Sequence, residues 1–139
     1  MNRNEQIVAA YAKYLGEHSV DYNNRQGFYV KIGLRNSDHT LIQLVPPFGR
    51  ERKFCIFDYI GTCYTGIRMA KRVAKEMQAR YPAYTVWAEN YYDSFEIDIE
   101  QCFVFTTVED LHQRVLRMVT VIDDCIPLGK EIAGEAFAR

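Results

Sequence analysis

The chain has 139 residues, of which 48% are hydrophobic and 25% are charged, and this composition predicts a single globular domain over residues 1–139. The formal net charge is -1, which argues against nucleic acid as the main partner, because phosphate binding usually shows as a basic excess. No apolar run is long enough to span a bilayer, and the amino terminus lacks the pattern of a secretion leader. We therefore expect a cytoplasmic protein that does not enter a membrane.

Residues 1–60 predict one helix followed by three strands. The helix has apolar residues at helical spacing, namely Ile7, Ala10, Tyr11, Tyr14 and Leu15. Alternating apolar and polar residues then predict strands over residues 28–34, 40–45 and 54–60. Turn-forming residues separate these strands, which favours an antiparallel meander.

The middle of the chain predicts a long amphipathic helix over residues 67–81. Its apolar stripe recurs at helical spacing and consists of Ile67, Ala70, Val73, Ala74, Met77 and Tyr81. Its opposite face is basic and carries Arg68, Lys71, Arg72 and Lys75. Pro82 ends the helix, because the residue before a proline is disfavoured in the α conformation.

Two further strands are predicted after this helix, over residues 84–90 and 95–105. In the second of them Phe95, Ile97 and Ile99 alternate with acidic residues, which predicts one buried face and one solvated face. The acidic residues are Glu96, Asp98 and Glu100. A bulge or bend is expected near residues 101–102, because a straight strand of this length would be longer than average.

A last helix is predicted from Thr106 to Ile126. Thr106 and Glu109 have the spacing of a capping box, which marks a helix start. Pro127 should break or kink the helix, and residues 128–139 are expected to pack loosely. The element order is therefore α-β-β-β-α-β-β-α, and the fold class is α+β, with helices packed on an antiparallel sheet.

This order resembles the type III secretion chaperone-like fold, which includes the YbjN-type bacterial proteins. The segments that carry the resemblance are residues 20–22, 69–81, 84–87, 95–99 and 106–111. The resemblance implies a small cytoplasmic protein, usually dimeric, that holds an extended partner segment against its sheet, and it supplies no catalytic residues. The secretion chaperones are acidic, whereas this chain is nearly neutral.

The acidic strand is the first candidate site. Glu96, Asp98 and Glu100, with Trp87 and Tyr84 nearby, could bind a basic segment of a partner, or they could form an ordinary solvated sheet face. A metal site is not predicted here, because a straight strand separates carboxylates that a cation needs at one point.

The basic face of the middle helix is the second candidate. Arg68, Lys71, Arg72 and Lys75 could bind nucleic acid, could contact the acidic strand of a second copy, or could form a solvated helix face.

The cysteines and histidines suggest no metal centre. Cys55, Cys102 and Cys125 are interpreted as small buried hydrophobic residues, since an even cysteine count without a secretion signal is weak evidence for disulfides. Cys63 is expected in a loop, where it could act as a nucleophile with His39 and Asp58. The histidines lack the close spacing of zinc ligands, and they are His18, His39 and His112.

The sequence therefore predicts a non-enzymatic, chaperone-like module that binds a protein or peptide and forms a homodimer, with no catalytic residue and no cofactor. Ten tyrosines support an interaction role, because tyrosine is enriched at interfaces. The alternatives are a small enzyme that uses Cys63 or the acidic strand, and a nucleic-acid-binding protein that uses the basic helix.

Overall fold

The computed structural model describes residues 54–139, residues 20–23, 29–32 and 42–45, and Gln6, Ala10, Tyr11 and Lys13. The chain divides into two compact units, of which the first comprises Met1–Phe57 and Cys102–Arg117, and the second comprises Asp58–Gln101 and Met118–Arg139. Helices and an antiparallel sheet are present, so the predicted α+β class is confirmed. The hydrogen-bonded strand order is β1-β2-β3-β4-β6-β5, and β7 also pairs with β4.

The first unit contains an antiparallel meander. It consists of β1 (Val20–Asn23), β2 (Tyr29–Ile32), β3 (Ile42–Val45) and the beginning of β4 (Phe54–Cys63). β1 is a strand that the sequence prediction missed, so four strands precede α2 where three were predicted. β2 and β3 lie within two of the predicted strands, whose remaining residues are outside the described part of the chain.

The first unit also contains the start of the helix α3 (Val108–Ala133). The Thr107 hydroxyl accepts a hydrogen bond from the Asp110 backbone N–H at 3.1 Å, so the capping residue is Thr107 and the predicted cap at Thr106 is wrong by one residue. Gln6, Ala10, Tyr11 and Lys13 are helical, and the other residues of the predicted first helix lie outside the described residues. Tyr11 is fully buried, and its hydroxyl lies 3.0 Å from Nδ1 of His112.

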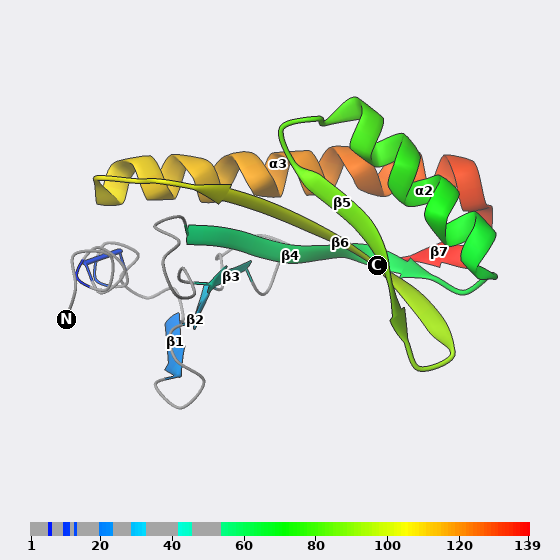
Figure 1. Ribbon diagram of the computed structural model, residues 1–139, viewed down its shortest axis with the longest axis horizontal. Helices are drawn as coiled ribbons and strands as arrows, with labels where there is room; N and C mark the ends of the chain where they lie inside the picture. The colour runs from blue at the N-terminus through cyan, green and yellow to red at the C-terminus, as the bar shows by residue number, and fades with distance from the viewer. Residues whose placement is uncertain are drawn as a thin grey trace. The chain divides into compact units, whose positions relative to one another are not determined.

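The second unit is built around the helix α2 (Ile67–Arg80), which covers one face of the hairpin formed by β5 (Thr85–Tyr91) and β6 (Ser94–Phe103) (Figure 1). Four residues of the predicted apolar stripe are buried, and these are Ala70, Val73, Ala74 and Met77. The Gln78 amide fixes the helix to the hairpin: it donates to the Tyr84 carbonyl at 2.6 Å and accepts from the Val86 N–H at 2.8 Å.

Further contacts fix the end of α2 to α3. The helix ends at Arg80, as Pro82 predicts, and the Tyr81 hydroxyl donates a hydrogen bond to the Asp124 carboxylate. This hydrogen bond is the main reason that the pKa of Tyr81 rises to about 12. Arg80 also forms an ion pair with Asp124 at 3.8 Å, although both side chains are about half exposed and the pair contributes little to stability.

The end of the chain packs differently from the prediction. α3 does not end at Pro127 but continues to Ala133, because Leu128 and Gly129 are buried and tertiary packing supports the helix. After a 3₁₀ turn (Gly134–Ala136), β7 (Phe137–Ala138) pairs with the end of β4, where the loosely packed tail was expected. The Phe137 side chain is buried against Gly61 and Gly129.

Substituting Gly61 tests this packing directly. A Cβ at Gly61 would lie 2.5 Å from the Phe137 ring and 2.9 Å from the Ala138 carbonyl oxygen. We expect Gly61→Ala to lower the free energy of unfolding by about 1–3 kcal/mol, measured by urea denaturation. The matched control is Gly66→Ala, where a Cβ meets nothing within 4 Å. Equal stability of Gly61→Ala and wild type would show that Phe137 does not pack here.

Candidate functional site

The register of the β5–β6 hairpin brings acidic and aromatic side chains onto one face. Trp87 lies directly opposite Asp98, Glu89 lies opposite Glu96, and Thr85 lies opposite Glu100. Directly opposed residues of an antiparallel pair share a face. We call this surface the acidic face and define it by Trp87, Glu89, Tyr91, Glu96, Asp98 and Glu100.

Tyr84 does not belong to this face, although the sequence grouped it with Trp87. It precedes β5, has the parity of Val86 rather than of Trp87, and is only 6% exposed. Its ring makes an edge contact with Tyr81, with the ring centroids 6.4 Å apart. Tyr84 is therefore a packing residue between α2 and the hairpin.

Asp98 contradicts the prediction that the acidic strand has a solvated face. Its side chain is 4% exposed, and its cross-strand neighbour is the large indole of Trp87. Burial raises the pKa of Asp98 to about 8, and a hydrogen bond with Glu96 and the negative charges of Glu96, Glu89 and Asp58 act in the same direction. The Asp98 carboxyl group therefore holds a proton at neutral pH. Its Oδ1 atom has no hydrogen-bond partner among the described residues.

Glu89 and Glu96 form a like-charge pair across the hairpin. The Trp87 indole N–H donates a hydrogen bond to Glu89 at 2.9 Å, which holds this carboxylate beside the ring. Within the described part of the chain neither Glu89 nor Glu96 forms an ion pair. Directly opposed like charges destabilise an antiparallel pair, and a cation placed between them would remove that cost. The acidic face is thus suited to bind positive charge.

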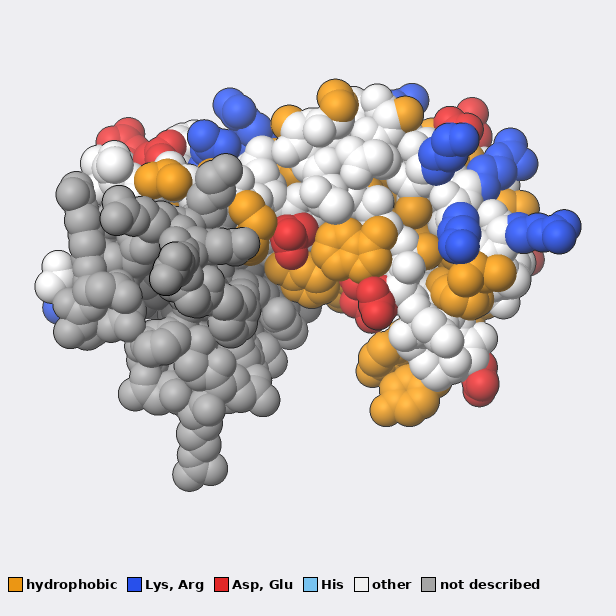
Figure 2. All heavy atoms as spheres, viewed as in Figure 1, with side chains coloured by type: hydrophobic (Ala, Val, Ile, Leu, Met, Phe, Trp, Pro, Cys, Tyr) orange, Lys and Arg blue, Asp and Glu red, His pale blue; other side chains and the backbone are white. Residues whose placement is uncertain are grey.

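The sequence missed Glu89 and Tyr91 as members of this face. Both have the same parity as Trp87 along β5, and this alternation is visible in the sequence once the apolar residues Val86 and Ala88 are assigned to the opposite face. Tyr91 is 55% exposed, and Tyr92 in the adjoining turn is 87% exposed. Figure 2 shows carboxylates and exposed hydrophobic side chains near one another on the visible surface.

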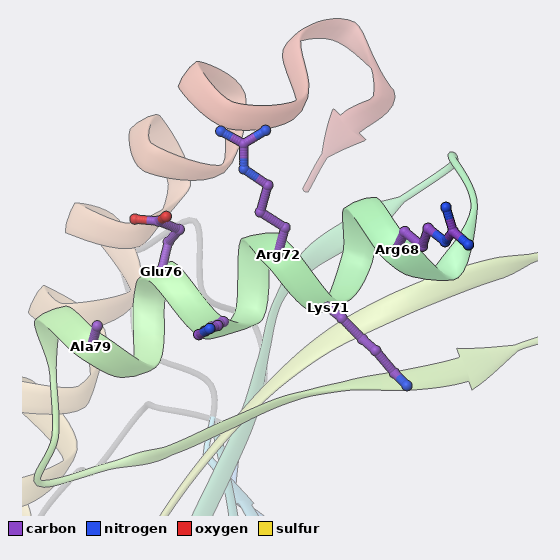
Figure 3. Close-up of a pocket in the computed structure, with 6 residues that line it drawn as sticks. Arg68, Lys71, Arg72, Glu76 and Ala79 are labelled. Carbon is purple, nitrogen blue, oxygen red and sulfur yellow. The ribbon is translucent and has the colours of Figure 1, made fainter.

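The basic face of α2 is the second charged surface of this unit, and it consists of Arg68, Lys71, Arg72 and Lys75. Its four cationic residues are exposed and line a hollow of about 430 Å³ together with Glu76 and Ala79. Figure 3 shows that Arg72 and Lys71 leave the helix in different directions, with Arg72 pointing away from the strands. None of the four forms an ion pair in the part of the chain that the structure describes. Helical periodicity alone brings them together, as the sequence predicts.

Asp58 is a second buried carboxylate, but here the chain supplies the cation. It is 3% exposed, and its Oδ2 lies 3.8 Å from Nη2 of Arg139. Arg139 also donates to the Tyr59 and Ile60 carbonyls, and its guanidinium lies 4.9 Å from the centre of the Tyr59 ring. Asp58 is therefore engaged in this contact, whereas the proposed partner His39 lies outside the described residues.

The cysteines differ from the prediction at three of four positions. Cys55 and Cys102 form a disulfide, and Cys102 is exposed rather than a buried hydrophobic residue. Cys63 is the last residue of β4 and is fully buried, with its sulfur 3.2 Å from the Thr65 hydroxyl, so it is not placed as an accessible nucleophile. Cys125 is buried as predicted, and burial raises its pKa to about 12. Disulfides are rare in the cytosol, so the bridge weighs against the expected cytoplasmic location.

No protein-family model, curated protein or solved structure matches the chain. The resemblance to the type III secretion chaperone-like fold therefore stays a prediction. In the residues that the structure describes, no helix has the length and apolar character needed to cross a membrane.

Reduction of the disulfide should expose two thiols and weaken the fold. The bridge closes a loop with a sequence separation of 47, and we expect its reduction to lower the free energy of unfolding by about 2–4 kcal/mol. A thiol reagent should find no reactive cysteine in the oxidised native protein and two after mild reduction, because Cys63 and Cys125 stay buried. The double variant Cys55→Ser/Cys102→Ser is the matched control and should not respond to reductant.

The raised pKa of Asp98 predicts a pH dependence of stability that Asp98→Asn removes. Between about pH 4 and pH 8 the folded state holds a proton on Asp98 that the unfolded state has lost. The stabilising contribution of this group is therefore complete below the unfolded pKa and is lost as the pH rises through the folded pKa. The free energy of unfolding of wild type, measured by urea denaturation, should fall relative to that of Asp98→Asn across this window. Parallel pH profiles of the two proteins would contradict the assignment.

Proposed function

We propose that the protein is a non-enzymatic binding module whose acidic face takes a positively charged segment of a partner protein. The observation that carries the proposal is the opposed pair Glu89 and Glu96, which forms no ion pair within the described chain. A stable hairpin has no structural need for two carboxylates at directly opposed positions. Departures from such local rules are expected at functional sites.

A basic polypeptide segment fits this face better than a metal ion. Successive carboxylates of β6 are separated by about 7 Å along the strand, whereas a hard cation needs several oxygens at one point. Lysine or arginine side chains at alternate positions of an extended segment have nearly the same spacing. Trp87 and Tyr91 on the same face offer aromatic surfaces to such cations.

The proposal agrees with the resemblance noted from the sequence. The type III secretion chaperone-like fold implies an extended partner segment held against the sheet, and a homodimer. We extend the first of these features, the extended partner segment, to this chain as part of the same proposal, and the homodimer stays a prediction of the resemblance. The acidic face would then be the part of the sheet that holds the segment.

A synthetic peptide of alternating lysine and threonine tests the function. We expect wild type to bind this peptide in fluorescence anisotropy, and we expect Glu96→Lys to weaken binding by about tenfold or more, because it places a like charge against the ligand. Glu131→Lys is the matched control: it makes the same charge change on the exposed surface of α3, outside both charged faces, and should leave the affinity unchanged. Binding should strengthen as the pH rises through about 8, where Asp98 loses its proton.

Two results would overturn the proposal. One is equal binding of a peptide in which glutamate replaces every lysine, because the face would then not select positive charge. The other is unchanged affinity of Glu96→Lys, because the peptide would then bind elsewhere on the chain.

A further inference from the structure

The hairpin and α2 together present two surfaces of opposite charge, and no ion pair joins them among the described residues. The acidic face carries Glu89 and Glu96, and α2 covers the other face of the same hairpin. All four cationic side chains of α2 are exposed, and in Figure 3 Arg72 points away from the strands while Lys71 points toward them. Both surfaces therefore keep their charge within one copy of the chain.

The two surfaces match in spacing as well as in sign. Directly opposed residues such as Glu89 and Glu96 have Cβ atoms about 4.5–5.5 Å apart. Residues three or four positions apart on a helix, such as Arg72 and Lys75, have Cβ atoms about 5–6 Å apart. Two adjacent cations of the helix can therefore face the two opposed carboxylates, and the long flexible side chains of arginine and lysine absorb the small difference.

We infer that the basic face of α2 in one copy of the chain docks on the acidic face of a second copy. This inference rests on the proposed function, because it makes α2 an internal version of the positively charged ligand. The contact is heterologous, since two different surfaces meet, and a pair of copies keeps one unused acidic face and one unused basic face at its two ends. Such contacts build chains of copies, or rings when the rotation closes. A free basic segment competes with α2 for the acidic face and disperses the assembly.

A polyanion is the other occupant that the basic face would accept. The charge of the whole protein argues against it, because the formal net charge is -1 and polyanion binding normally requires a basic excess. Surfaces of both signs on a nearly neutral protein favour association of the protein with itself.

Sedimentation velocity of the full chain tests the inference. Wild type should increase in mass with protein concentration at about 0.02 M salt and should return to the monomer at about 0.5 M salt, because the contact is electrostatic. Neutralising either surface should leave a monomer under both conditions. The variants are Glu89→Gln/Glu96→Gln for the acidic face and Arg72→Gln/Lys75→Gln for the basic face. Mixing these two variants should restore a one-to-one complex that does not grow, because only one intact surface of each kind remains.

Glu131→Gln/Glu135→Gln is the matched control, since it removes two exposed carboxylates outside both surfaces and should associate like wild type. A wild type that stays monomeric at low salt, a Glu89→Gln/Glu96→Gln variant that still associates, or a mixture that forms no complex would each overturn the inference. The lysine–threonine peptide separates this failure from failure of the proposed function. If the peptide binds wild type and the protein stays monomeric, only the self-association is wrong; if neither occurs, both are wrong.

Discussion

The second unit depends on the register of the β5–β6 hairpin. Because side chains alternate between the faces of a strand, the register that places Val86 and Ile99 under α2 also places Glu89 opposite Glu96 on the other face. A slip of one residue would exchange the two faces and expose the apolar side chains. The Gln78 amide resists such a slip. It forms hydrogen bonds with the carbonyl of Tyr84, just before β5, and with the N–H of Val86, within β5. The apolar packing and the charged surface are therefore consequences of one pairing.

The hairpin also contains two locally unfavourable features. Tyr92 in its two-residue turn has a φ of 55°, a conformation that costs a residue with a side chain about 1–2 kcal/mol relative to glycine. The opposed pair Glu89 and Glu96 lies a few residues away. Both features could be removed by single substitutions that favour the hairpin, such as glycine in the turn. The turn itself accounts for the φ of Tyr92, because two-residue hairpin turns need a positive φ at their first residue, whereas nothing in the hairpin requires the opposed carboxylates.

Sequence periodicity predicted the features that are set within a single helix or strand. The buried stripe of α2, its end before Pro82 and the buried residues Ile97 and Ile99 follow from helical and strand spacing. The burial of Asp98 does not, because it depends on how β6 is placed between β4 and β5 rather than on spacing within β6. The disulfide of Cys55 and Cys102 joins residues distant in sequence, and no spacing rule identifies such a pair. Helix continuation past Pro127 likewise depends on tertiary burial of Leu128 and Gly129.

The two buried carboxylates, Asp58 and Asp98, differ in the charge of the side chain beside each of them. Asp58 has the Arg139 guanidinium beside it, and this cation contacts the neighbouring backbone as well, so the pair is a completed structural contact. Asp98 instead has Glu96 as its hydrogen-bonding neighbour and holds a proton at neutral pH. A cation that approaches this carboxyl group would favour its ionised form and release the proton, so binding of positive charge and deprotonation of Asp98 are coupled. Under the proposed function, a basic ligand that brings a cation close to Asp98 would therefore increase the negative charge of the acidic face, and such a ligand would be favoured over one that contacts only the exposed glutamates.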